Sequence, residues 1–218
     1  MRLSIMGLLR DIRDIFRKDR KLFLYVNVYY FGLVLLGALI ALAFPQAQLF
    51  LINTAGNILG GGAFNPFTAI GDVYRSGNVL DAAAVTFVYN LVLGTLVEIT
   101  IPSLAVPFWG PILGAVRALE WGIMLIIPVP GVFPLDRAVP HYLTILLEGE
   151  AYVVAIFACV RQARVLLKLG SIPADQRIKT YVSAMVDNFK LLPVVALLLA
   201  VSALYEAWEV MFFAGVIK

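Results

Sequence analysis

The residues from 22 to 44, LFLYVNVYYFGLVLLGALIALAF, most strongly limit how this chain can fold. The run contains no charged side chain. About 20 apolar residues are needed for an α-helix to cross the hydrocarbon core of a bilayer. Because backbone N–H and C=O groups find no water in that core, a segment that crosses it singly must be helical. The run therefore predicts a membrane-spanning helix near the N-terminus.

The rest of the chain is almost as apolar as this run. Of the 218 residues, 61% are hydrophobic and 14% are charged, with a mean hydropathy of +0.91, whereas soluble domains have about 45–50% apolar and 25% charged residues. Four further segments are long and apolar enough to span: 82–101, 104–129, 140–160 and 191–214. We therefore expect an all-α integral membrane bundle of about five transmembrane helices, forming a single membrane domain over residues 1–218.

The basic residues predict the orientation of this bundle. Residues 1–21 contain seven lysines and arginines and the 161–190 connection contains six, whereas 45–81, 130–139 and the C-terminal tail contain one each. Loops rich in Lys and Arg stay on the cytoplasmic side. We therefore expect a multi-pass protein of the plasma membrane with a cytoplasmic N-terminus and an outer C-terminus. Since topology explains these basic residues, they do not indicate a nucleic-acid partner.

Two segments outside the spans have helical periodicity. Residues 2–18 repeat apolar side chains at helical spacing opposite a charged face, and residues 174–190 do so on a smaller scale, which predicts amphipathic helices at the cytoplasmic surface. The outer segment 45–81 is apolar but is interrupted by Gly60–Gly62 and by Asn65-Pro66. Surface helices are the favoured interpretation of this segment, and a re-entrant element is the alternative.

Every glutamate of the chain lies inside a predicted span, and every aspartate lies outside. Arg117 is the one basic residue inside a span, and His141 is expected at the outer rim of the fourth. A carboxylate inside the membrane costs several kcal/mol. The six glutamates therefore cannot all be ionised and paired with protein groups. Some must be protonated, hydrogen-bonded, exposed to water or facing a cation.

Helical spacing assigns these residues to faces. Thr86, Asn90, Gly94 and Glu98 recur at i+4 and form one stripe that should face the bundle. In the third span Gly110, Gly114, Arg117 and Trp121 share a face, and Glu120 lies within reach of Arg117. The spacing of Gly110 and Gly114 suits close helix packing, inside the bundle or at a dimer seam.

The fourth and fifth spans contain the remaining acids. His141, Thr144, Glu148, Tyr152, Ala155 and Cys159 fall within one arc. Glu150 lies about 200° around the helix from Glu148, so the two acids serve different surfaces. Glu206 and Glu209 share a face of the fifth span. Counted from the predicted span ends, Arg117, Glu148 and Glu150 all lie near the midplane. We predict that Arg117 pairs with Glu148 across helices.

Two interpretations of this polar set stay open. The acids could be hydrogen-bonding links between helices, or a subset could line a pathway for protons, cations or a polar solute. The candidate residues are Glu148, Arg117, Glu98, Asn90, Glu120, Glu150, His141, Tyr152, Glu206 and Glu209.

Signals for an enzyme are weak. The chain has one histidine and one cysteine, and it contains no HExxH, no GxSxG and no Walker-type glycine loop. We therefore expect no catalytic residues, no metal and no cofactor. Cys159 is expected to be a small buried hydrophobic residue.

Three blocks of the sequence resemble a known family. FVYNLVLGTLVE (87–98), GPILGAVRALEWGIM (110–124) and VPHYLTILLEGEAYVVA (139–155) resemble the stage II sporulation protein M family of polytopic membrane proteins. The chain departs from the family pattern in placing Tyr142 after His141 and the glutamates later, so either Glu148 or Glu150 could hold the family's position.

The resemblance implies a non-enzymatic membrane scaffold, which would contact the lipid bilayer and a protein partner or a second copy of itself. The alternative is a small transporter or channel that uses the intramembrane glutamates. A scaffold should tolerate single Glu→Gln changes, whereas a transporter should lose flux.

Overall fold

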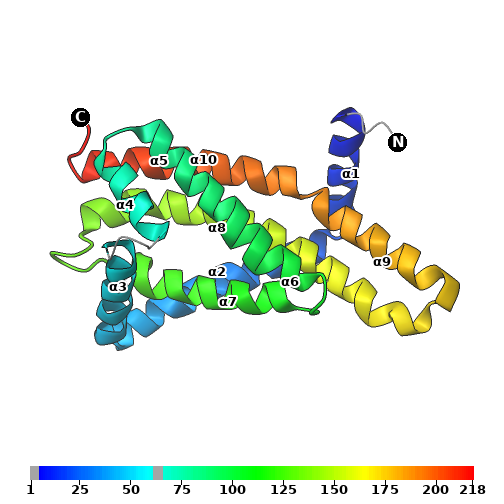
Figure 1. The fold of residues 1–218 in the computed structure, drawn as a ribbon. Coiled ribbons are helices and arrows are strands. Elements are labelled where there is room, and N and C mark those ends of the chain that lie inside the picture. Colours follow the sequence, from blue (N-terminus) through cyan, green and yellow to red (C-terminus); the bar gives the residue numbers. More distant parts are fainter. Residues whose placement is uncertain (1–4, 61–65) are drawn as a thin grey trace.

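The computed structural model describes residues 5–60 and 66–218 as a bundle of helices (Figure 1). In the described residues the only β-type pairing is one isolated bridge between Val129 and Phe133. The predicted all-α fold is therefore confirmed. In chain order the elements are α1 (Ile5–Lys18), α2 (Arg20–Ala43), α3 (Pro45–Gly60), α4 (Pro66–Arg75), α5 (Val79–Val88), the π-helix η1 (Tyr89–Thr100), α6 (Ile101–Ser103), α7 (Trp109–Trp121), the π-helix η2 (Gly122–Ile126), α8 (Leu135–Lys168), the 3₁₀ turn η3 (Leu169–Ser171), α9 (Ala174–Phe189) and α10 (Leu192–Phe213).

Five helical stretches of the described chain are long and apolar enough to cross a membrane, in agreement with the predicted number. They are Arg20–Ala43, Val79–Ser103, Trp109–Ile126, Leu135–Ser171 and Ala174–Phe213, the last of which includes α9 and α10. Large apolar side chains such as Leu35, Leu39 and Leu197 remain more than 60% exposed on these helices. Such an apolar surface is suited to contact with lipid acyl chains. Together with the five spans, it makes the chain a multi-pass membrane protein.

Two helices begin at residues other than the predicted span starts, for local reasons. The third helix begins at Trp109 and not at residue 104, because residues 104–108 form a turn that places Phe108 at a positive φ of 64°. The fourth helix begins at Leu135 and not at residue 140, because α8 accommodates Pro140 in its interior. With 34 residues, α8 is about 50 Å long. It therefore extends beyond a hydrocarbon core of about 30 Å.

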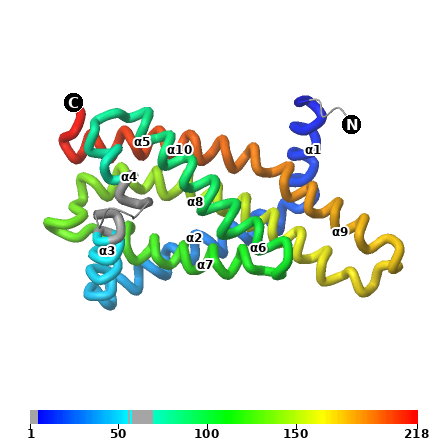
Figure 2. The backbone as a smooth tube through the Cα atoms, viewed as in Figure 1, coloured from blue at the N-terminus to red at the C-terminus, as the bar shows by residue number. Residues whose placement is uncertain are grey.

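The two basic segments lie at the same end of the bundle. α1 crosses the bundle axis at that end and α9 lies beside it, whereas α3, α4 and the C-terminus lie at the opposite end (Figures 1 and 2). Lys190 Nζ lies 3.1 Å from a carboxylate oxygen of Asp11. Arg161 Nε donates to Asp19 over 2.8 Å. These contacts join segments that are distant in the sequence. Which end faces the cytoplasm stays a prediction.

The 45–81 segment forms helices at the end of the bundle that is opposite to α1. α3 ends at Gly60 and α4 begins at Pro66, on either side of the predicted break. Residues 61–65, which include most of that break, lie outside the described residues. In Figure 1, α3 runs across the bundle axis and not along it.

The small-residue face of α7 packs against α8. A side chain at Gly110 would meet Cys159 Cβ at 3.0 Å, and one at Gly114 would meet Ile156 Cδ1 at 2.3 Å. This glycine face is therefore internal packing and not an open dimer seam. Cys159 is 1% exposed, as expected of a small core residue.

Gln48 of α3 satisfies backbone groups at the end of η2. Its Nε2 donates to the carbonyl of Ile127 over 2.6 Å and lies 3.4 Å from the carbonyl of Met124. Its side chain is 3% exposed. Because η2 ends in extended backbone at Ile127, these carbonyls are not bonded within a continuing helix.

We expect Gln48→Ala to destabilise the protein by about 1–3 kcal/mol, because it leaves buried carbonyl groups without a donor. Thermal unfolding in detergent would measure the change. Gln46→Ala is the matched control, since Gln46 is exposed on the same helix. An equal loss for both variants would contradict the assigned role of Gln48.

Candidate functional site in the bundle

A cavity of about 500 Å³ lies within the bundle, on the side of α3 and α4. The acidic and basic side chains of its lining are His141 and Glu148 of α8 and Glu206 of α10. The rest of the lining is Ala55, Ile70, Tyr74, Thr86, Tyr89, Asn90, Trp121, Leu125, Thr144 and Ile145. Eight helical elements of the chain therefore contribute to one cavity, which extends into the membrane-spanning bundle.

Helical periodicity explains how α8 reaches the cavity. His141, Thr144 and Glu148 are spaced by three and four residues, so the predicted arc faces inward as one surface. The two π-helical segments border the same cavity, η1 through Asn90 and η2 through Leu125. π-Helical turns are rare and often occur at functional sites.

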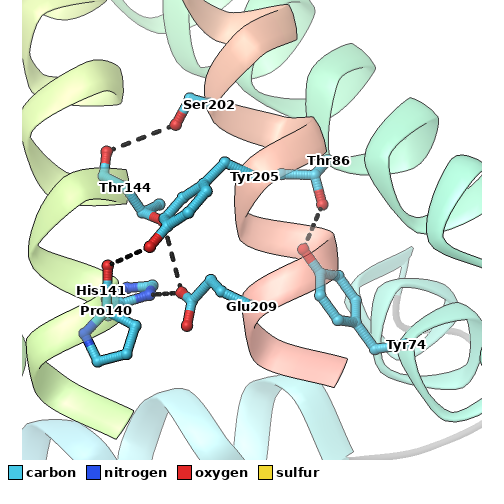
Figure 3. Close-up of polar contacts among 8 residues, drawn as sticks. All are labelled: Tyr74, Thr86, Pro140, His141, Thr144, Ser202, Tyr205 and Glu209. Atoms are coloured by element: carbon cyan, nitrogen blue, oxygen red, sulfur yellow. Dashed lines mark hydrogen bonds and ion pairs between the residues drawn. The ribbon is translucent and has the colours of Figure 1, made fainter. Parts of the chain in front are cut away.

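His141 and Glu209 form a buried pair beside the cavity (Figure 3). His141 Nδ1 lies 2.5 Å from Glu209 Oε1, and the two side chains are 14% and 2% exposed. Thr144 Oγ1 lies within 3.4 Å of the same carboxylate oxygen. The side chain of His141 is therefore buried against α10 and paired with an acid. Its position at the outer end of the fourth span stays a prediction.

Two more hydrogen bonds hold α10 against α8. Tyr205 donates its hydroxyl to the carbonyl of Pro140 over 3.1 Å, and Ser202 donates to the carbonyl of Thr144 over 3.4 Å (Figure 3). These bonds fix the rotation of α10. They account for the position of Glu206, which faces the cavity while Glu209 faces His141.

Tyr74 of α4 brings the 45–81 segment into the site. Its hydroxyl lies 3.0 Å from Thr86 Oγ1 of α5 (Figure 3). Burial raises the pKa of the Tyr74 phenol well above its ordinary value. The phenol therefore stays protonated, and it joins α4 to the wall of the cavity.

Arg117 pairs with Glu98 and not with Glu148. Arg117 Nη2 lies 2.5 Å from Glu98 Oε2. The guanidinium carbon lies 4.4 Å from the centre of the Tyr152 ring. The predicted Arg117–Glu148 pair is wrong because a tight turn joins α6 to α7, which makes the two spans antiparallel neighbours. Glu98 and Arg117 lie at similar distances along the chain from that turn and therefore meet.

Gly94 makes room for this arginine. A Cβ atom at Gly94 would lie 2.8 Å from Arg117 Nη1 and 2.8 Å from the Tyr152 hydroxyl. Thr86 and Gly94 are both buried, so the predicted stripe of the second span does face the bundle. The residues of the stripe have different surroundings. Asn90 lines the cavity, whereas Glu98 pairs with Arg117.

Glu120 and Glu150, like Glu98, Arg117, Tyr152 and Glu209, do not line the cavity. Glu120 is exposed and lines a groove with Glu98 and Arg117. Glu150 is partly buried and lies within interaction range of the Asn27 amide on α2. Glu148 and Glu150 therefore face different surfaces, as their spacing predicted.

Sequence reasoning missed the aromatic part of the site. Tyr74, Tyr89 and Trp121 line the cavity beside the acids. Tyr74 could not be assigned, because its segment has no clear periodicity. Trp121 was placed on the polar face of its span, but nothing in its spacing distinguished a packing residue from a lining residue.

The acids of the cavity have no basic partner. Within the described parts of the chain, the histidine next to Glu206 is paired with Glu209, and Arg117 is paired with Glu98. Neither Glu148 nor Glu206 forms an ion pair there. The Tyr152 hydroxyl and the Asn90 amide lie within interaction range of the Glu148 carboxyl group, and the Tyr74 hydroxyl lies within interaction range of Glu206. In residues 5–60 and 66–218, no group of three His, Cys, Asp or Glu side chains is arranged to hold a metal ion.

Comparisons with known proteins give no relative: no family model, no curated protein and no solved structure matches the chain. The class of protein is therefore defined from the fold and the site alone. The protein is a multi-pass α-helical membrane protein with an acidic cavity inside its bundle.

Proposed function

We propose that this protein is a membrane carrier that binds a small cation in the cavity, with Glu148 and Glu206 as its binding groups. The observation that supports this most is that two carboxyl groups face one cavity and, within the described residues, neither forms an ion pair with a basic side chain. A carboxylate without a partner is costly inside a membrane. It is neutralised either by a proton or by a bound cation, and a carrier can exchange one for the other.

The aromatic lining supports an organic cation as the solute. Tyr74, Tyr89 and Trp121 stand beside Glu148 and Glu206. Aromatic faces attract ammonium and guanidinium groups, most strongly where water is excluded. A cavity of about 500 Å³ has the size of a small-molecule site. The proposed cycle is therefore an exchange of protons for a small ammonium or guanidinium ion.

Flux into vesicles tests this function. Purified protein would be reconstituted into vesicles with a trapped pH dye, and guanidinium or tetramethylammonium would be added outside, since neither crosses a bilayer as a neutral base. We expect cation uptake with release of lumenal protons. Glu148→Gln should reduce the rate by about tenfold or more, the cost of losing a charged partner. Glu120→Gln, outside the cavity, should keep the wild-type rate.

The scaffold hypothesis gives the opposite result. If the wild-type protein moves neither cation and no protons, the carrier proposal fails. The scaffold role implied by the resemblance to the stage II sporulation protein M family would then be favoured. Equal flux for wild type and Glu148→Gln would also contradict the binding role of Glu148.

A further inference from the structure

A second charged site lies at the end of the bundle that carries α1. Arg17, Lys18, Arg20, Lys21 and Arg164, here called the basic cluster, surround a hollow of about 250 Å³. The hollow forms where α1 meets α2 and where α8 passes beside them. Leu22 and Tyr25 complete its wall on the side of α2.

The basic cluster has no acidic partner of its own. Asp19 is the one acid that lines the hollow, and it accepts a hydrogen bond from Arg161 Nε over 2.8 Å. Among the described residues, no ion pair involves any of the five members of the cluster. All five are exposed. Several unpaired cations around one small hollow repel one another, and an anion bound there would relieve this repulsion.

The position of the hollow selects the source of that anion. Leu24 and Tyr25, at the start of the α2 span, are 59% and 65% exposed. α1 crosses the bundle axis at the same level (Figure 1). It leaves Ile5 and Met6 78% exposed, which suits an amphipathic helix in the interface of the membrane. The hollow therefore lies where phospholipid head groups meet acyl chains.

We propose that the basic cluster binds the phosphate of an anionic phospholipid, whose acyl chains lie along the exposed apolar face at the start of α2. Arginine presents a planar pair of N–H donors to phosphate oxygens, and lysine adds a point charge. Basic pockets beside transmembrane helices are a recurring type of lipid head-group site. A free phosphate ion would use the cluster but would gain nothing from Leu24 and Tyr25.

Thermal unfolding of the intact protein in a neutral detergent tests this site without reference to transport. Phosphatidylglycerol, phosphatidylcholine and inorganic phosphate would be added in separate samples. We expect phosphatidylglycerol to raise the Tm by at least about 3 °C, since a ligand that binds only the folded state stabilises it. Phosphatidylcholine and phosphate should change the Tm little.

Pairs of substitutions distinguish lipid binding by the basic cluster from a general effect of positive charge. Lys21→Gln with Arg164→Gln should lose most of the shift with phosphatidylglycerol, whereas Lys21→Arg with Arg164→Lys should keep it. Arg10→Gln with Lys168→Gln is the matched control, because it removes the same charge from exposed positions outside the hollow. An equal loss in the control, an equal shift with inorganic phosphate, or no shift with the anionic lipid would overturn the proposal.

Discussion

Replacing Gly122 with valine is expected to lower the Tm by roughly 10 °C or to prevent folding. A Cβ atom at Gly122 would lie 2.0 Å from the carbonyl oxygen of Val34 and 2.9 Å from the Cα atom of Gly37. Both contacts are with the backbone of α2, which cannot rotate away as a side chain can. The two helices must separate, and the loss of their packing should cost about 3 kcal/mol or more.

The measurement is thermal unfolding in detergent, with size-exclusion chromatography to detect misfolded protein. Gly32→Ala is the control, because Gly32 lies on α2, the helix that Gly122 contacts, and a Cβ atom there meets nothing within 4 Å. That change should be neutral or slightly stabilising, since alanine favours a helix over glycine. Unchanged stability in Gly122→Val would show that α2 and η2 do not approach closely.

The spans could be predicted from the sequence because the bilayer demands one simple property. A run such as 22–44 must be long and apolar, and this is visible without any tertiary information. The exact ends could not be predicted, because they depend on local backbone choices. The turn that leads to Phe108 lies in an apolar stretch and carries no charge to reveal it.

The candidate site was predicted in part for the same reason. The arc of His141, Thr144 and Glu148 follows from helical spacing alone. The partners of these three residues depend on which helices pack side by side and on the level along the bundle axis at which they meet. The sequence of one helix does not contain this information. Arg117 was assigned to Glu148 by depth, whereas the antiparallel turn brings Glu98 to it. To predict the Arg117–Glu98 pair from that turn, the correct first residue of α7 would have been needed.

The glycines show the same limit. The spacing of Gly110 and Gly114 indicated a close contact, and the structure places it against α8. Among the described glycines, Gly37 and Gly122 make closer approaches to the backbone of a neighbouring helix, between α2 and the end of the third span. These two residues are on different spans, so no motif within one segment joins them. The repeated small residues Gly37, Ala38 and Ala41 on one side of α2 were the available signal.

Replacing His141 with leucine is expected to destabilise the protein by roughly 3–5 kcal/mol, because it leaves the buried Glu209 carboxylate without its partner. His141 Nδ1 lies 2.5 Å from that carboxylate, and Glu209 is 2% exposed. The hydroxyl of Thr144, at 3.4 Å, is a weak substitute. Thermal and denaturant unfolding of the single variant would measure the loss.

Adding Glu209→Leu to His141→Leu should restore most of that stability, since two apolar side chains of similar volume can replace a buried pair at little cost. The exposed pair of Arg75 and Asp72, with side chains 67% and 71% exposed, is the control. Arg75→Leu should change stability by no more than about 1 kcal/mol. The two possible outcomes for the double variant have different meanings. If the double variant were as unstable as His141→Leu alone, the pair would not be coupled. The stability of this region would then come from the packing of α10 on α8. A restored double variant would show instead that the Glu209 charge requires His141. It would leave Glu148 and Glu206 as cavity acids that form no ion pair within the described residues.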